Sequence, residues 1–150
     1  DRIILAQISG TDRALLWEGT PLELRRRFPS AAEFRGFLRE KADPNGSRVY
    51  EGVSRAIEYA AQRQAAGCDP KRSAVVVLSD CVDMSEGSPI DAEGMAAVVA
   101  SYCDTGAAVA FYFVDQTVAR ELRESLEEHG AREFRVETNI VANPPLPRIE

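Results

Sequence analysis

Long apolar runs, phosphate-binding loops and an excess of basic residues are all missing from this sequence of 150 residues. No stretch approaches the roughly 18 consecutive apolar residues of a membrane-spanning helix, which excludes direct insertion into a membrane. Neither a GxxxxGK nor a GxGxxG motif occurs, so no cradle for the phosphates of a nucleotide is expected. The net charge of −6 argues against nucleic acid or an anionic membrane surface as a partner.

Histidine and cysteine are scarce as well. The single histidine, His129, ends a predicted helix, where the helix dipole favours an imidazolium, so we do not expect a general base. The three cysteines, Cys68, Cys81 and Cys103, have no CxxC spacing and fit neither a disulfide framework nor a zinc site. Reduced, structural thiols are the simpler interpretation, and they slightly favour a cytoplasmic location.

The first third of the chain predicts a hairpin followed by two short helices. Apolar runs at 3–8 and 14–17 flank the turn-forming residues 9–12, a pattern typical of antiparallel strands. Thr20 begins a capping-box sequence, and Pro29 interrupts the helical spacing that follows, so two helices are expected within 21–41. The run of three arginines at 25–27 is expected to be a solvated helix face.

The rest of the chain alternates between helices and strands. A helix is expected from Val49 to about residue 66, with Gly67 as its left-handed cap. The continuously apolar, β-branched run at 74–78 predicts a strand covered on both faces. A polar loop from Cys81 to Ile90 leads to an expected helix with Met95, Val98, Val99 and Tyr102 on its core face. A strand at 107–114 follows, then a helix from Asp115 that stops at His129, and a final strand at 133–137.

Strands that alternate with helices imply right-handed crossovers and a parallel sheet. The predicted fold class is therefore α/β: a single domain over residues 1–150 with three layers, α/β/α. Its sheet is expected to be mostly parallel and Rossmann-like, with the antiparallel hairpin on one edge. The proline-rich residues 143–150 predict an extended tail.

Ligands of such sheets bind outside the carboxyl ends of the strands. Asp80 follows Ser79 at the end of the 74–78 strand, and Ser47, in the loop before the long helix, can reach the same edge. Oxygen ligands of this kind suit Mg²⁺. Ser47 and Asp80 are therefore the candidate metal ligands. A structural interpretation stays open, in which Ser47 caps its helix and Asp80 accepts hydrogen bonds from the following loop.

A second hypothesis uses the same strand end. Asp80 and Asp83 form a DxxD pair, and metal-dependent phosphotransfer uses clustered carboxylates of this kind. The alternative function is therefore a doubly wound phosphatase or phosphodiesterase.

Taken in order, these segments resemble a von Willebrand factor type A (vWA) domain. The hairpin that begins Asp-Arg-Ile-Ile-Leu at residues 1–5 resembles the second and third strands of that family. The segment 45–53, Asn-Gly-Ser-Arg-Val-Tyr-Glu-Gly-Val, resembles its loop of Gly, then Thr, before a helix. The segment 75–80, Val-Val-Val-Leu-Ser-Asp, resembles its strand ending in Ser-Asp, usually followed by Gly.

The resemblance implies a non-enzymatic protein-interaction module with a divalent metal at a metal-ion-dependent adhesion site. That site uses a D-x-S-x-S loop, a Thr and an Asp; by position, Ser47 stands for the Thr and Asp80 for the Asp. Cys81 replaces the usual Gly, which suggests a different loop path. The D-x-S-x-S loop is absent, so weak or no Mg²⁺ binding by this chain alone is expected. A third interpretation is a degenerate scaffold module without metal.

The resemblance also implies a missing strand. In the family's sheet, of order 3-2-1-4-5-6, the first strand lies between the strands that correspond to 3–8 and 74–78. Without it, two rows of backbone groups would be orphaned. We expect a strand, the metal loop and a helix upstream of Asp1. The alternatives are strand complementation from another chain, including a homo-oligomer, or closure of the sheet without that strand.

Overall fold

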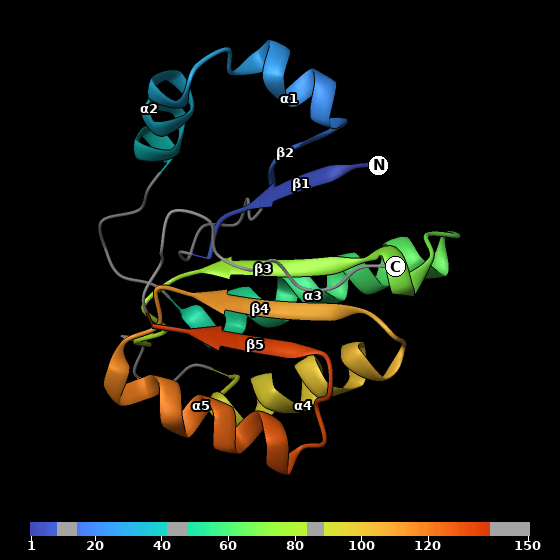
Figure 1. The fold of residues 1–150 in the computed structure, drawn as a ribbon, viewed down its shortest axis with the longest axis vertical. Coiled ribbons are helices and arrows are strands. Elements are labelled where there is room, and N and C mark those ends of the chain that lie inside the picture. The colour runs from blue at the N-terminus through green and yellow to red at the C-terminus, as the bar shows by residue number, and fades with distance from the viewer. Residues whose placement is uncertain (9–14, 42–47, 84–88, 139–150) are drawn as a thin grey trace.

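The computed structural model describes residues 1–8, 15–41, 48–83 and 89–138 and shows a mixed α/β fold (Figure 1). The predicted turn at 9–12 and the predicted tail at 143–150 lie outside the described residues. In chain order the elements are β1 (Ile3–Ala6), β2 (Leu15–Gly19), α1 (Pro21–Arg27), α2 (Ala31–Lys41), α3 (Val49–Ala65), the 3₁₀ turn η1 (Pro70–Arg72), β3 (Ala74–Leu78), α4 (Ala92–Asp104), β4 (Ala108–Tyr112), α5 (Gln116–Glu128) and β5 (Phe134–Glu137).

The strands form two separate sheets. β1 and β2 pair antiparallel, which confirms the hairpin, and β3, β4 and β5 form a parallel sheet in that order. The expectation that the hairpin is an edge of the parallel sheet is wrong, because no hydrogen bond joins β1 to β3. The alternative in which the sheet closes without a further strand requires β1 to pair directly with β3, and the described residues do not show this pairing.

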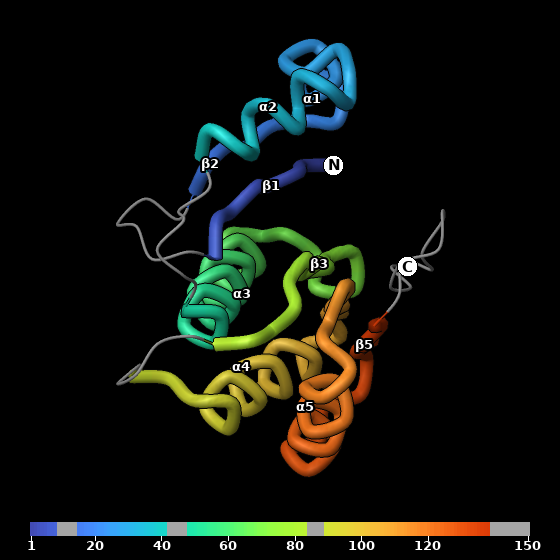
Figure 2. The backbone as a smooth tube through the Cα atoms, turned by 90° about the vertical axis from the view of Figure 1, so that its left-hand side faces the viewer, coloured from blue at the N-terminus to red at the C-terminus, as the bar shows by residue number. Residues whose placement is uncertain are grey.

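The helices that pack on the parallel sheet, α3, α4 and α5, all lie on one side of it (Figure 2). They enclose the hydrophobic core with the inward-facing residues of the strands, which include Val77, Val109, Phe111 and Val136. The third layer that the sequence predicts is not formed by any described helix. No described helix is both long and apolar enough to cross a bilayer.

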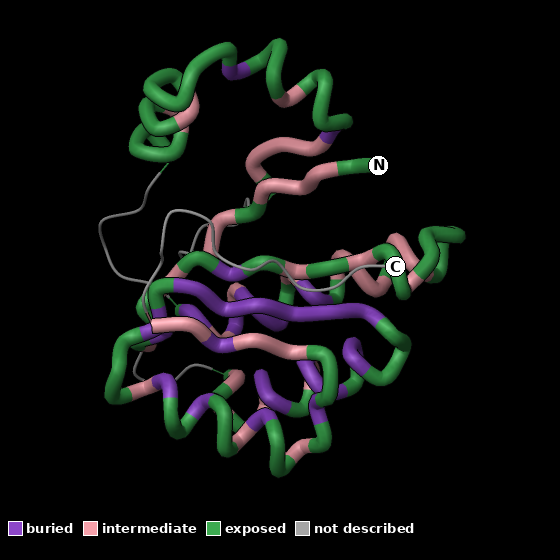
Figure 3. Tube along the Cα trace, viewed as in Figure 1, coloured by how far each residue is buried: buried purple, intermediate pink, exposed green. Residues whose placement is uncertain are grey.

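β3 and β4 differ sharply in exposure (Figure 3). β4 is buried along its whole length, as a central strand should be. In β3, Val77 is 4 % exposed, but Val76 is 45 % and Leu78 63 % exposed. The expectation that β3 is covered on both faces is therefore wrong. The physical reason is twofold: β3 is the edge strand of its sheet, and the exposed residues alternate along it, on the face that α3, α4 and α5 do not cover.

Local capping signals place several helix ends as predicted. Thr20 and Glu23 form the capping box that starts α1. Asp115 accepts a hydrogen bond from the backbone N–H of Thr117 and starts α5. Gly67, with φ of 103°, follows α3 and supplies the expected left-handed conformation.

The α1–α2 arm carries little buried surface. Neither helix contains a buried residue, and the arm is held together by ring contacts of Phe28 with Phe34 and Phe37 at the break between the helices. The three arginines at 25–27 are exposed, which confirms the solvated face. In Figure 1 the arm stands apart from the parallel sheet, on the far side of the hairpin.

Long-range contacts to α3 hold the hairpin in place. Glu18 of β2 accepts a hydrogen bond from the Tyr59 hydroxyl at 3.0 Å and pairs with Arg63, both from α3. At Gly52 the helix comes so close to the segment after β1 that a Cβ would lie 2.6 Å from the carbonyl oxygen of Ile8. The hairpin is thus attached through a helix rather than through sheet hydrogen bonds.

Candidate functional site

The carboxyl ends of β3 and β4 are joined by backbone hydrogen bonds. The N–H of Ser79 donates to the carbonyl of Tyr112 at 3.1 Å, and the N–H of Asp115 donates to the carbonyl of Asp80 at 2.9 Å. The segments that follow the two strands therefore lie at one edge, as the sequence predicts. Asp80 lies on this edge, directly after Ser79.

The Asp80 carboxylate is exposed and oriented by its own loop. Its Oδ1 accepts a hydrogen bond from the N–H of Val82 at 3.1 Å and lies 3.5 Å from the Ser79 hydroxyl. Its Oδ2 accepts from no described group. The structural interpretation of Asp80 is thus correct for one oxygen, while the other is available to a ligand.

Cys81 makes the turn that directs the chain away from β3. Its φ of 60° lies in the left-handed region that favours glycine. The side chain is buried, and burial, with a smaller contribution from the Asp80 charge, raises the pKa of the Cys81 thiol to about 11. Cys81 thus keeps a glycine-type backbone conformation, and its thiol stays protonated and non-nucleophilic at neutral pH. The suggested change of loop path finds no support in this backbone angle.

Asp83 caps a distant helix. Its Oδ2 accepts a hydrogen bond at 3.2 Å from the N–H of Tyr50, in the first turn of α3, where the helix dipole favours a carboxylate. Burial raises the pKa of the Tyr50 hydroxyl, and Asp83 adds to this shift. Sequence reasoning missed this contact because 33 residues separate the partners and leave no local spacing signal.

Asp115 reaches the edge but is used as a helix cap. It accepts hydrogen bonds from the Thr117 hydroxyl at 2.5 Å and the Thr117 N–H at 2.8 Å. These hydrogen bonds hold the pKa of Asp115 below its ordinary value. Both hydrogen bonds go to one carboxylate oxygen, Oδ1, which is therefore engaged within the protein.

Ser47, the other candidate metal ligand, lies outside the described residues, as do residues 84–88 of the loop from Cys81 to Ile90. Within the described ranges, no group of three or more His, Cys, Asp or Glu side chains is arranged to hold a metal ion. In this part of the chain, Asp80 is the candidate ligand that the structure places at the strand edge.

Three large apolar side chains are exposed at positions close to Asp80 in the chain or in the β3–β4 register. Leu78, two residues before Asp80, is 63 % exposed, and Val82, two residues after Asp80, is 42 % exposed. Phe113 follows Tyr112, the register partner of Leu78, and is 53 % exposed with φ of 68°. Sequence reasoning missed this set because an apolar strand pattern predicts burial. We call Leu78, Val82 and Phe113 the apolar rim.

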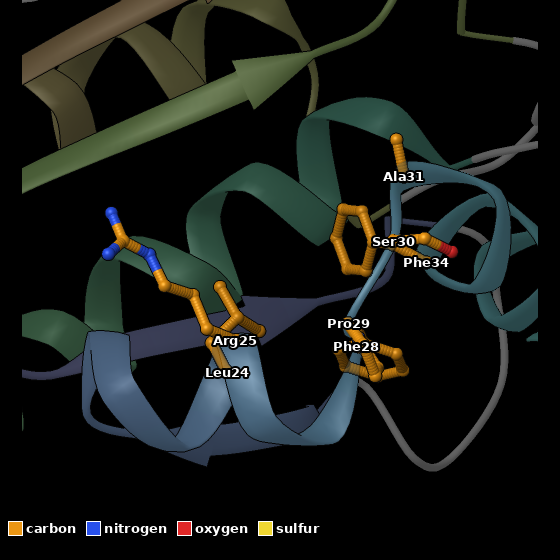
Figure 4. Close-up of a pocket in the computed structure, with 7 residues that line it drawn as sticks. All are labelled: Leu24, Arg25, Phe28, Pro29, Ser30, Ala31 and Phe34. Carbon is orange, nitrogen blue, oxygen red and sulfur yellow. The ribbon is translucent and has the colours of Figure 1, made fainter.

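A shallow pocket of about 240 Å³ lies elsewhere, in the α1–α2 arm (Figure 4). Its only ionisable side chain is that of Arg25, so it offers neither a metal site nor a general acid–base pair. Its lining residues are Leu24, Arg25, Phe28, Pro29, Ser30, Ala31 and Phe34.

Comparisons with known proteins identify no relative: no family model, no curated protein and no solved structure matches this chain.

Proposed function

We propose that this chain is a non-enzymatic protein-interaction module of the vWA type and that its binding surface is the edge around Asp80. The observation that carries the proposal is the exposed Asp80 carboxylate, with one oxygen unengaged, within the apolar rim. Exposed apolar side chains that gather in one place are characteristic of protein-interaction surfaces. A fixed carboxylate among them supplies a point of specificity.

The vWA-like, three-layer form of the fold is part of this proposal. Three features support it: the hairpin that precedes the helices, the parallel β3–β4–β5 sheet, and the Ser79–Asp80 pair directly after β3. The unpaired edges of β1 and β3 are where the family's first strand would lie.

Mg²⁺ is the proposed metal ion. Asp80 is its proposed carboxylate ligand, and Ser47 is its second proposed oxygen ligand. Mg²⁺ prefers six oxygen ligands and keeps several waters. A site with few protein ligands therefore leaves coordination positions that water or another ligand can occupy. A carboxylate of a protein partner would fill one of them. Binding to this chain alone is expected to be weak, because only one described carboxylate is offered.

The phosphatase alternative requires Asp80 and Asp83 at one metal ion. The hydrogen bond from Tyr50 to Asp83 supports a structural role for Asp83 instead. The metal-free scaffold would use the apolar rim alone, so it differs from the main proposal in its response to divalent metal.

Paramagnetic Mn²⁺, which shares the oxygen preference of Mg²⁺, tests the metal site by NMR. Mn²⁺ should broaden the amide signals of residues 79–83, Mg²⁺ should reverse the broadening, and Asp80→Ala should abolish it. Asp69→Ala is the matched control, because exposed Asp69 accepts from the Lys71 N–H at 3.0 Å just as Asp80 accepts from Val82. Equal broadening in Asp80→Ala and the unchanged chain would contradict the site.

A further inference from the structure

The pocket of the α1–α2 arm is mostly apolar and open to solvent (Figure 4). Phe28, at the end of α1, and Phe34, in α2, both line it, and their ring centroids lie 5.2 Å apart. Ala31, which also lines the pocket, is exposed. At about 240 Å³ the pocket is smaller than those that hold drug-sized ligands, and it suits one large side chain.

Two guanidinium groups flank this pocket. Arg25 lines it from α1, and Arg35 of α2 donates from Nε to the carbonyl of Ala31 at 3.3 Å. No described carboxylate forms an ion pair with either arginine. Residues 20–41 carry six basic and three acidic side chains, whereas the whole chain has a net charge of −6. The arm is thus a basic region of an acidic protein.

The edge at Asp80 has the complementary character. Two backbone hydrogen bonds hold Phe113 next to this edge: one joins Ser79 to Tyr112, and the other joins Asp115 to Asp80. Phe113 is 53 % exposed, and Oδ2 of Asp80 accepts from no described group. The edge therefore presents an aromatic ring and a carboxylate to the solvent.

The backbone at Phe113 is a second, independent sign of a binding role. Its φ of 68° lies in the left-handed region, which is costly for a bulky side chain. Such conformations persist where the surrounding structure enforces them, and they cluster at ligand-binding and active sites. Here the conformation accompanies a large ring that is left in solvent rather than packed in the core.

The aromatic residues of the chain indicate what occupies the pocket. Among the described residues, Phe113 is the only aromatic side chain that is exposed. None of the residues outside the described ranges is aromatic. This chain therefore carries both an aromatic-lined pocket with basic flanks and one exposed ring beside a carboxylate.

We propose that the arm of one copy of this chain docks on the Asp80 edge of a second copy, with Phe113 in the arm pocket and the Asp80 carboxylate beside Arg25 and Arg35. The ring supplies apolar contact area, and bonds between guanidinium and carboxylate fix the orientation. Each copy offers one arm and one edge, so a two-fold symmetric dimer satisfies both contacts. Within one copy the contact is not made, because the arm stands on the far side of the hairpin from the parallel sheet (Figure 1).

The inference rests on the proposed interaction surface, whose partner it names, but not on the metal ion. Association is therefore measured in EDTA by sedimentation velocity, where the unchanged chain should show a reversible monomer–dimer equilibrium. Ala31→Phe fills the pocket from an exposed position and should weaken association at least about tenfold. Ala32→Phe is the matched control: Ala32 is exposed and does not line the pocket, so association should stay within about threefold.

Phe113→Gly tests the edge. Glycine suits the left-handed backbone, so the variant keeps the fold while it loses the ring. It should weaken association at least about tenfold. Leu15→Ala, which trims another exposed apolar side chain in β2, should have little effect. A mixture of Ala31→Phe and Phe113→Gly chains contains one intact arm and one intact edge per pair, so it should form a dimer that neither variant forms alone.

A monomer at every concentration, or a dimer that Ala31→Phe and Phe113→Gly leave unchanged, would overturn the inference. A mixture of the two variants that stays monomeric would overturn it too, because the contact would then not join an arm to an edge. Binding to phosphatidylserine vesicles that Ala31→Phe abolishes, without any dimer, would assign the pocket to a lipid surface instead. Each of these failures leaves the Mn²⁺ test of the proposed function unaffected, since that test observes only the metal site.

Discussion

Gly52 in α3 lies against the backbone of Ile8, and a Cβ at Gly52 would come within 2.6 Å of the Ile8 carbonyl oxygen and 2.9 Å of the Ile8 Cα. A backbone cannot give way as the end of a flexible side chain can. This contact lets the segment after β1 pack on the helix, so it fixes the hairpin relative to the parallel sheet.

Gly52→Ala should therefore destabilise the protein by about 1–3 kcal/mol, as overpacking does, although alanine is the better helix former. Gly36→Ala is the control, because Gly36 also lies in a helix but a Cβ there meets nothing within 4 Å. Chemical denaturation gives the free energy of unfolding of each variant. Equal stability of the two variants would show that the approach to Ile8 is not tight.

The Glu18 cluster predicts an acid-sensitive attachment of the hairpin. The hydrogen bond from Tyr59, assisted by Arg63, holds the pKa of Glu18 below its ordinary value of 4.5. Because folding lowers this pKa, the stabilisation is present above the ordinary value and is lost as the pH falls through the lowered one. Glu18→Gln should lower the melting temperature at pH 7 and lessen its dependence on pH below 4.5.

Glu124→Gln is the matched control for that experiment. Glu124 faces Arg120 at 3.9 Å on the exposed surface of α5, and such pairs contribute little to stability. Its melting curves from pH 3 to pH 7 should follow those of the unchanged chain. If Glu18→Gln follows them too, the cluster does not hold the hairpin.

Neighbouring valines of β3 should respond differently to truncation. Val77 is 4 % exposed and packs in the core, so Val77→Ala should cost about 1–3 kcal/mol of unfolding free energy. Val76 is 45 % exposed, and Val76→Ala should change the free energy of unfolding by less than about 0.5 kcal/mol. Comparable losses at the two positions would mean that β3 is covered on both faces.

The cysteines should react with a thiol reagent according to their surroundings. Cys68 is exposed, whereas burial raises the pKa of both the Cys81 and the Cys103 thiol to about 11. At pH 8 one thiol per chain should react rapidly, and Cys68→Ser should remove that reaction. All three thiols should react once the chain is denatured. Rapid labelling of Cys81 in the folded chain would contradict its burial.

Local signals in the sequence were enough to predict the helices and strands of the described residues. Thr20, Pro29 and Asp115 act on their immediate neighbours, so the helix ends near them could be predicted and are confirmed. The apolar run at 74–78 predicted a strand, but its pattern does not say whether a neighbour lies beside it. The exposure of Val76 and Leu78 depends on which elements pack beside and over β3 in the folded chain and therefore could not be predicted.

For the candidate site as well, the features set by neighbouring residues could be predicted, and the tertiary contacts could not. Asp80 follows directly from the strand end, because carboxyl ends of parallel strands share an edge. The engagement of Asp83 with Tyr50 depends on how α3 packs beneath the loop after β3, a tertiary contact without a sequence pattern. Phe113, 53 % exposed, follows β4 with a left-handed backbone conformation, which an apolar run of residues does not reveal.

Mn²⁺-induced broadening of the Val82 amide signal, compared between Asp80→Ala and Asp69→Ala, tests most directly whether the edge at Asp80 is the binding surface. The Val82 N–H donates to the Asp80 carboxylate at 3.1 Å, so an ion held by that carboxylate must lie close to it. We predict that the broadening is kept in Asp69→Ala and lost in Asp80→Ala. Equal broadening in the two variants would contradict the assignment of Asp80.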